Sequence, residues 1–171
     1  IAVRADAPVV LDLPPTHLEL SWRPLHARDV DGLFALIGAI ELADRHPQLT
    51  SREEVSEYFV GTWKDLQADS LGGFDHDGVL RAYAFVEVRP GDERVVRAFL
   101  SGGVHPAWRG RGLGRAVLAW LEGRGRQKLV ETGKELPARL AAFVLESARD
   151  QRRLYAAAGF SPVRWYTDMR R

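Results

Sequence analysis

The segment Val104-His-Pro-Ala-Trp-Arg-Gly-Arg-Gly-Leu-Gly-Arg-Ala-Val-Leu118 places glycine and arginine where an apolar helix begins. Glycines occupy alternate positions at 110, 112 and 114, and arginines stand among them at 109, 111 and 115. Glycine destabilises a helix by about 1 kcal/mol relative to alanine. Its repeated use at a helix entrance therefore indicates a role other than helix formation.

Anion binding explains this composition. A helix N-terminus leaves backbone N–H groups unpaired and carries roughly half a positive charge. Glycine lets a ligand approach the backbone without interference from Cβ, and arginine adds bidentate donors for phosphate. The segment therefore predicts a polyphosphate site. A P-loop is excluded because no Gly-Lys-Ser/Thr occurs, and the third glycine comes one residue early for a dinucleotide fingerprint.

The composition is that of one globular domain, with 171 residues of which 46% are hydrophobic and 27% charged. No apolar run approaches the ~18 residues of a membrane helix, and Asp6 and Asp12 interrupt the stretch where a signal peptide would be apolar. We therefore predict no membrane partner. The absence of cysteine excludes disulfides and thiolate metal sites and fits a cytoplasmic location. The histidines show no metal-ligand spacing, so we predict no metal.

Charge is divided unevenly along the chain. Residues 1–104 hold 10 basic and 17 acidic side chains, whereas residues 105–171 hold 14 basic and 6 acidic ones. The basic half predicts an anionic ligand, and the acidic half favours a cationic acceptor. Nucleic-acid binding through the basic half is a weaker alternative, which would fall steeply with salt. We predict no nucleic-acid partner.

Hydrophobic periodicity predicts an α+β, or mixed α/β, domain over residues 18–171 after an extended arm over 1–17. Strands are predicted at 18–22, 71–74, 80–88, 95–104 and 140–145, with one or two more over 160–169. Helices are predicted from Val30 to Ile40, from a capping box at 50–53 to Leu66, from Gly112 to a stretch loosened by Gly123 and Gly125, and over 150–158. These elements predict a mostly antiparallel sheet of six to seven strands with about four helices.

Two motifs in this order resemble a known family. Arg109-Gly-Arg-Gly-Leu-Gly114 is similar to the Arg/Gln-x-x-Gly-x-Gly/Ala pattern of the GCN5-related N-acetyltransferases (GNAT). Leu154-Tyr-Ala-Ala-Ala-Gly-Phe160 resembles that family's Leu-Tyr-x-x-x-Gly-Phe element. The resemblance implies the GNAT fold as a single domain, with a parallel strand pair at 95–104 and 139–146 that splays apart. The closing segment, 160–171, resembles the end of the first half of actinobacterial tandem GNAT proteins. A second GNAT domain and a homodimer are therefore both open.

The resemblance implies acetyl-CoA as co-substrate, with its pyrophosphate on the glycine-arginine turn and its pantetheine arm between the splayed strands. The residues implied to bind it are Gly103, Val104, Arg109, Gly110, Arg111, Gly112, Leu113, Gly114, Arg115, Ser147, Arg152 and Tyr155. Position 148 is alanine where the family often has asparagine. Ser147 is the predicted substitute, and Arg152 would reach the adenosine phosphates.

The implied reaction is direct attack by the amine of a small molecule or peptide on the thioester. Glu87 is the first candidate for the general base, and Glu41, in the loop over 41–51 where the acceptor would lie, is the second. The Val104 N–H would bind the oxyanion, and Tyr155 would protonate the leaving thiolate. His105 is interpreted as structural. The alternative function is an inactive domain of the same shape that binds acyl-CoA and serves a partner.

Overall fold

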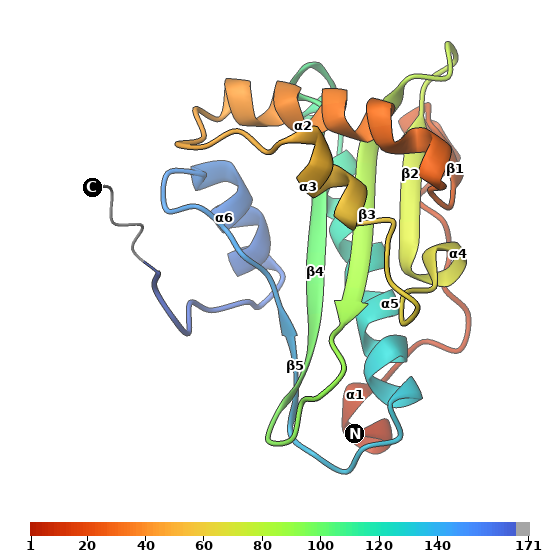
Figure 1. The fold of residues 1–171 in the computed structure, drawn as a ribbon, viewed down its shortest axis with the longest axis vertical. Helices are drawn as coiled ribbons and strands as arrows, with labels where there is room; N and C mark the ends of the chain where they lie inside the picture. The colour runs from red at the N-terminus through yellow and green to blue at the C-terminus, as the bar shows by residue number, and fades with distance from the viewer. Residues whose placement is uncertain (167–171) are drawn as a thin grey trace.

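A computed structural model describes residues 1–166 and contains one five-stranded sheet with the strand order β1-β2-β3-β4-β5. The strands are β1 Ser21–Arg23, β2 Ser70–Phe74, β3 Leu80–Val88, β4 Val96–Val104 and β5 Ala138–Ala141. All neighbours are antiparallel except β4 and β5, which run parallel (Figure 1). The predicted mixed sheet with a parallel pair is confirmed, with five strands where six to seven were expected. Residues 160–166 form no strand, and the rest of the predicted final strands lies outside the described residues.

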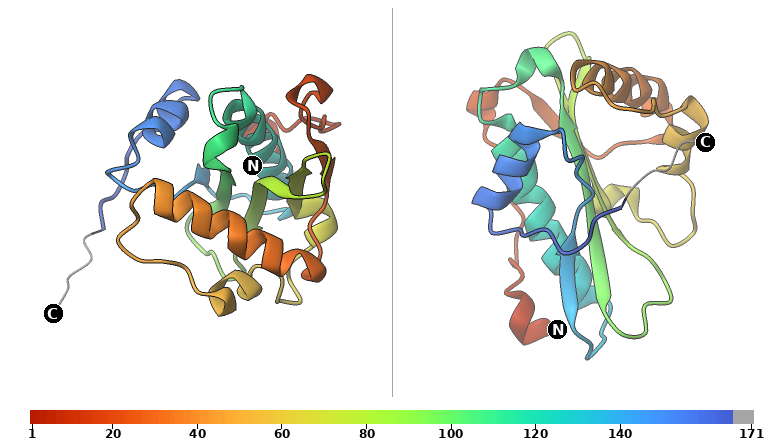
Figure 2. Two further views of the ribbon diagram at one scale, coloured as in Figure 1. Left: turned by 90° about the horizontal axis from the view of Figure 1, so that it is seen from above. Right: turned by 90° about the vertical axis from the view of Figure 1, so that its left-hand side faces the viewer.

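Helices cover both faces of the sheet. They are α1 Ala2–Ala5, α2 Val30–Ala43, α3 Arg52–Glu57, α4 Leu66–Asp69, α5 Leu113–Glu131 and α6 Arg149–Ala157, and 3-10 turns occupy Thr16–Leu18, Ala27–Asp29 and Pro106–Trp108. The helix α5 packs on one face of the sheet, and α2 and α3 lie on the other, so that the sheet is the middle layer (Figure 2). No helix within residues 1–166 is long and apolar enough to cross a membrane.

Strand β3 shows how the sequence builds these layers, because successive side chains point to opposite faces. Ala82 and Ala84 belong to the core under α5, whereas Tyr83 and Phe85 belong to the core under α2 and α3. Small residues face the long helix α5 and aromatic residues face the shorter helices. The sheet therefore lies close to α5 and presents a row of larger side chains to the α2 side.

Two helix predictions were wrong in detail. Of the helix predicted over 50–66 only α3, Arg52–Glu57, is formed before α4 begins at Leu66, and the capping box is shifted by one residue. Ser51 and Glu54 form the box, with 3.2 Å from the Glu54 N–H to Ser51 Oγ and 2.7 Å from the Ser51 N–H to Glu54 Oε2. Thr50 instead donates its backbone N–H to the Glu41 carboxylate, 2.9 Å away.

The helix α5 is not loosened at Gly123 and Gly125 but continues to Glu131. A Cβ atom at Gly125 would stand 2.8 Å from Leu140 and 3.0 Å from Leu100, so glycine here permits close packing of the helix on β4 and β5. The N-terminal arm is also packed rather than simply extended. Ile1 is buried beside the short helix α1, and Gln127 of α5 donates a 2.8 Å hydrogen bond to the Pro8 carbonyl.

Candidate functional site

An opening in the sheet lies where β5 separates from β4. The two strands pair from Val96 opposite Ala138 to Phe99 opposite Ala141, where β5 ends. Strand β4 continues to Val104 and pairs there only with β3. The backbone edge from 100 to 104 therefore faces the opening. The parallel pair is shorter than predicted, because its second strand ends at Ala141 rather than at 146.

The glycine-arginine turn stands at the end of this opening. Gly110 and Gly112 have φ values of 77° and 90°, in the left-handed region that favours glycine. Gly112 is the N-cap of α5, and no side chain within residues 1–166 caps the helix there. Leu113 is 1% exposed and anchors the first turn in the core. The first N–H groups of α5 are consequently left without a side-chain partner.

The three arginines of the turn have different partners. Arg109 forms a bidentate pair with Asp44 at the end of α2, with distances of 2.6 and 2.9 Å, and its Nε donates to the Val104 carbonyl at 3.3 Å. Arg111 lies over the Trp108 ring at 4.7 Å. Arg115 has no ion pair among the residues described. Arg109 therefore fastens the turn to α2, and a phosphate would have to compete with Asp44 for it.

Tyr155 is brought to the same end by α6. Leu154 lies 3.4 Å from the point where a Cβ of Gly114 would stand, so α6 packs against the first turn of α5. Tyr155 is 8% exposed, and its ring packs edge-on against Phe160 with centroids 5.1 Å apart. Burial, followed by the charge of Glu122, raises the pKa of Tyr155 to about 12. Its hydroxyl is thus protonated at neutral pH, as a proton donor must be.

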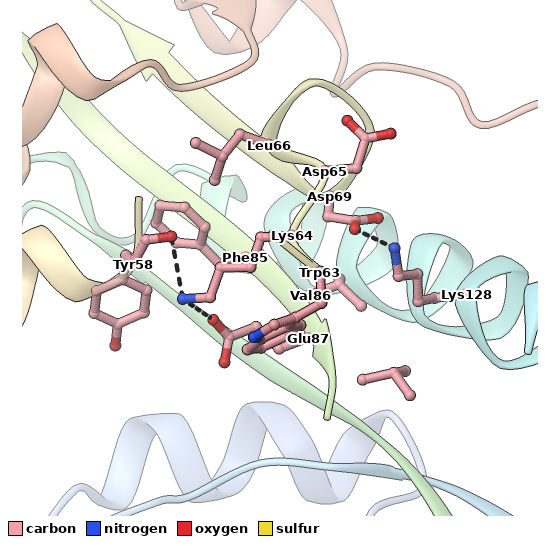
Figure 3. Close-up of a pocket in the computed structure, with 11 residues that line it drawn as sticks. Tyr58, Trp63, Lys64, Asp65, Leu66, Asp69, Phe85, Val86, Glu87 and Lys128 are labelled. Atoms are coloured by element: carbon pink, nitrogen blue, oxygen red, sulfur yellow. Dashed lines mark hydrogen bonds and ion pairs between the residues drawn. The ribbon is translucent and has the colours of Figure 1, made fainter. Parts of the chain in front are cut away.

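Glu87, the first candidate base, is already paired. The Lys64 ammonium lies 2.8 Å from its carboxylate and donates to the Tyr58 carbonyl at 3.3 Å (Figure 3). It also donates to the Glu57 carbonyl at 2.6 Å. The cavity beside this pair has a volume of about 10 Å³, enough for one water molecule. An incoming ammonium would therefore have to compete with Lys64 for the Glu87 carboxylate.

Glu41, the second candidate, is 5% exposed and accepts hydrogen bonds from both the N–H and the hydroxyl of Thr50. Glu41 lies in the last turn of α2 and not in the predicted loop, and it ties the end of that helix to the loop before α3. Tyr58 lies between the two acids. Its pKa is raised by burial and then by the charge of Glu87, while a hydrogen bond with Ser101 of β4 works in the opposite direction. Glu87, Glu41 and Tyr58 all lie on the α2 face of the sheet, from which the opening is also reached.

Ser147 and Arg152 line an open depression of about 580 Å³, whose other walls are Pro47, Leu145, Glu146, Arg149 and Tyr166. Arg152 donates to the Glu146 carbonyl at 3.2 Å. His105 accepts from the Ala107 N–H at 3.2 Å within its own turn, as a structural residue would. In the described part of the chain, Asp75, His76 and Asp77 form a cluster that could hold a metal, but they lie in the β2–β3 turn. The absence of a metal stays a prediction.

Sequence reasoning missed the partners of the predicted residues. Lys64 is 23 positions from Glu87, and Asp44 is 65 positions from Arg109. No periodic or local signal links such pairs, because they form only when α2 and the loop after α3 fold over the sheet. The glycine turn needs no such partner and could be found from the sequence.

Comparison with known proteins agrees with this geometry. A split parallel strand pair with a glycine-rich helix entrance at its end is the arrangement expected of an acetyltransferase. The family model described as "Acetyltransferase (GNAT) domain" matches residues 74–162, which is more than half of the chain. The chain therefore belongs to the GNAT acetyltransferase family.

Solved structures show the same fold. A GCN5-related N-acetyltransferase from Sphaerobacter thermophilus is 28% identical with a TM-score of 0.72, and the match covers 89% of this chain but only 45% of that one. The GNAT domain of S. lividans PAT matches at 19% identity and a TM-score of 0.63, covering 90% and 94%. Diaminobutyrate acetyltransferase EctA from Paenibacillus lautus, solved with L-2,4-diaminobutyric acid and coenzyme A, matches at 17% and 0.57, covering 82% and 74%. No curated protein matches.

Proposed function

We infer that the chain is an N-acetyltransferase that moves an acetyl group from acetyl-CoA to a primary amine. One observation carries this inference: the uncapped, glycine-bared start of α5 lies at the end of the opening between β4 and β5. A diphosphate bound to the turn would direct a pantetheine arm along the free edge of β4. Coenzyme A bound to a solved relative, EctA, supports the choice of ligand.

The cofactor contacts divide by chemistry. Backbone N–H groups from Gly110 to Gly114 would bind the pyrophosphate, with Arg111 and Arg115 adding charge. Gly103 and Val104 would bind the pantetheine and the thioester carbonyl through their backbone. Ser147 and Arg152 stay predictions for the outer part of the cofactor, as does Arg109 while it is paired with Asp44.

Calorimetric titration with acetyl-CoA tests this assignment. Arg115→Ala should weaken binding about tenfold or more, the equivalent of one lost charge-assisted hydrogen bond. Arg28→Ala, which removes an exposed arginine just before α2, is the matched control and should leave the affinity unchanged. Equal affinity for all three proteins, or no heat of binding at millimolar acetyl-CoA, would remove the basis of the proposal.

In the reaction, the amine nitrogen bonds to the thioester carbon and the C–S bond breaks. The sulfur leaves as a thiolate and takes the Tyr155 hydroxyl proton, while the amine loses its own proton to solvent or to a carboxylate. The Val104 N–H would stabilise the oxyanion of the tetrahedral intermediate. Because a thiol has a pKa of about 8.5, the thiolate can leave without help, and Tyr155→Phe should slow turnover without abolishing it.

The alternative is a domain that binds acyl-CoA but does not turn it over and serves a partner. This alternative is supported by Glu87 and Glu41, because the carboxylates of both candidate bases are already bound by other residues of the chain. Release of free CoA measured with a panel of amines separates the two. Tight binding with no release above hydrolysis, and an unchanged background in Tyr155→Phe, would establish the alternative. A second GNAT domain or a homodimer as partner stays open, as does the cytoplasmic location proposed from the absence of cysteine.

A further inference from the structure

Acidic and basic groups around the opening differ in how far they are neutralised. Two of the acids form ion pairs, Asp44 with Arg109 and Glu87 with Lys64, whereas Glu41 accepts hydrogen bonds from the uncharged Thr50. Asp44 and Glu87 are therefore neutralised by cations of the chain itself, whereas Glu41 is only hydrogen-bonded. An acceptor that carries extra positive charge stays a prediction.

Arginines gather on the α2 face of the sheet below the opening. Arg139 of β5 stands opposite Arg97 of β4 in the parallel register. On the other neighbour of β4, strand β3, Val88 pairs with Ala98. Arg89 follows Val88 and therefore lies beside Arg97. Arg97 shares its charge with Asp92 at 3.6 Å, but neither Arg89 nor Arg139 has a carboxylate within 4 Å among residues 1–166.

An aromatic row separates these arginines from the opening. The Arg89 guanidinium lies 5.2 Å above the centre of the Phe99 ring. Phe99 stacks on Phe143 with centroids 5.7 Å apart and planes inclined by 2°, and Tyr166 packs against Phe143 at 6.0 Å. Phe143 and Tyr166 are 67% and 68% exposed, which leaves an open apolar platform at the point where the strands part.

The order of side chains along β4 sets the distance between the amine of an acceptor and a second group that reaches the arginines. Phe99 and Ser101 lie on the same face, two residues apart, which is about 6.6 Å in a strand. Ser101 borders the opening, where the thioester would lie, and the Arg89 guanidinium stands over Phe99. An acceptor whose amine reaches the Ser101 level would therefore place a group about 7 Å away beside the Arg89 guanidinium, with its body against the aromatic rings. Arg139, in register with Arg97, would reach the same group from two residues farther along the strand.

We propose that the acceptor is a small amine that also carries a carboxylate, separated from the amine by an apolar or planar spacer of roughly this length. The carboxylate pairs with Arg89 and Arg139, the spacer packs on Phe99 and Phe143, and the amine lies at Ser101. The inference rests on the proposed acetyltransferase function but concerns a different surface from the cofactor turn.

The test uses 4-(aminomethyl)benzoate, its amide 4-(aminomethyl)benzamide, and the ω-amino acids from glycine to 8-aminooctanoate. We expect kcat/KM for the benzoate to exceed that for the amide by about tenfold or more, as for loss of a charge-assisted contact. In the aliphatic series the optimum should fall near 6-aminohexanoate. Arg89→Gln with Arg139→Gln should abolish the preference for the acid without lowering activity on the amide, whereas Arg28→Gln should change neither.

Binding measured by calorimetry in the presence of saturating CoA separates the two proposals. Binding of the benzoate in preference to the amide, without turnover, would support the acceptor inference and contradict the proposed function. Turnover of both compounds at equal efficiency, or a preference that survives in the double arginine variant, would overturn the inference and leave the function standing. Binding of neither compound at millimolar concentration also overturns it.

Discussion

Replacing Gly110 with alanine tests whether the backbone of the glycine-arginine turn binds the pyrophosphate. Gly110 has φ 77°, and no atom lies within 4 Å of the place where its Cβ would stand. The cost of the change is therefore backbone strain alone, about 1–2 kcal/mol. Gly78 in the β2–β3 turn has φ 75° and the same empty surroundings, which makes Gly78→Ala a matched control. Each variant should melt about 2–8 °C lower than the parent.

Coenzyme A then distinguishes the two variants. At a ligand concentration of 100 times Kd, binding stabilises the parent by about 2.7 kcal/mol. A methyl group at Gly110 would stand between the turn and the pyrophosphate. A tenfold loss of affinity would lower the stabilisation at that concentration to about 1.4 kcal/mol, roughly halving the thermal shift. Gly78→Ala should keep the full shift. Equal CoA-induced shifts in the two variants would refute the placement of the pyrophosphate at Gly110.

Three further predictions follow from single contacts. Arg124→Met should lower the free energy of unfolding by about 1–3 kcal/mol in urea titrations, because buried Asp69, 2.8 Å away, would lose one partner and keep Lys128. Burial and the charges of Arg81 and Arg109 lower the pKa of His105 in the folded protein. The free energy of unfolding should therefore fall as the pH drops below 6.5, the ordinary pKa of histidine, and His105→Asn should remove this part of the pH dependence. Lys64→Met removes the cation beside the proposed position of the amine and should move the acidic limb of the pH–rate profile to higher pH, because the ammonium form of the amine is then less disfavoured. An unchanged profile would show that Lys64 does not act on the amine.

Local patterns predicted the parts of the fold that need only near neighbours. The alternation along 80–88 gives β3 its two faces, and the glycines at 110 and 112 adopt the left-handed conformations that a turn into a helix demands. The parallel pair and the opening followed from the resemblance to a family rather than from periodicity. The second strand of the parallel pair was predicted too long, because the apolar run from 140 to 145 continues past Ala141, the last residue that pairs with β4.

The segment 50–66 shows why longer predictions failed. Val55, Phe59, Trp63 and Leu66 have helical spacing, yet the helix ends at Glu57. Gly61 has φ 134°, a conformation incompatible with a continuous helix, and Lys64 reaches back to the carbonyls at the end of α3. Those carbonyls and Glu87 together hold the Lys64 ammonium. A competing tertiary contact thus overrode a correct local pattern, and single-sequence reasoning has no access to it.

The same contact bears on how the amine loses its proton. With a pKa of about 10, an alkylamine is roughly one part in a thousand neutral at pH 7, a deficit of about 4 kcal/mol. A carboxylate base would offset this, but Glu87 and Glu41 are both engaged. Positive surroundings act in the same direction without accepting a proton, because nearby cations disfavour the ammonium form and lower its pKa. In the proposed acceptor position Arg89 and Arg139 pair with the carboxylate at the far end of the acceptor, and Lys64 is the cation beside the amine. Glu87 would then release Lys64 and pair with the incoming ammonium. The same carboxylate would first bind the amine and afterwards accept its proton.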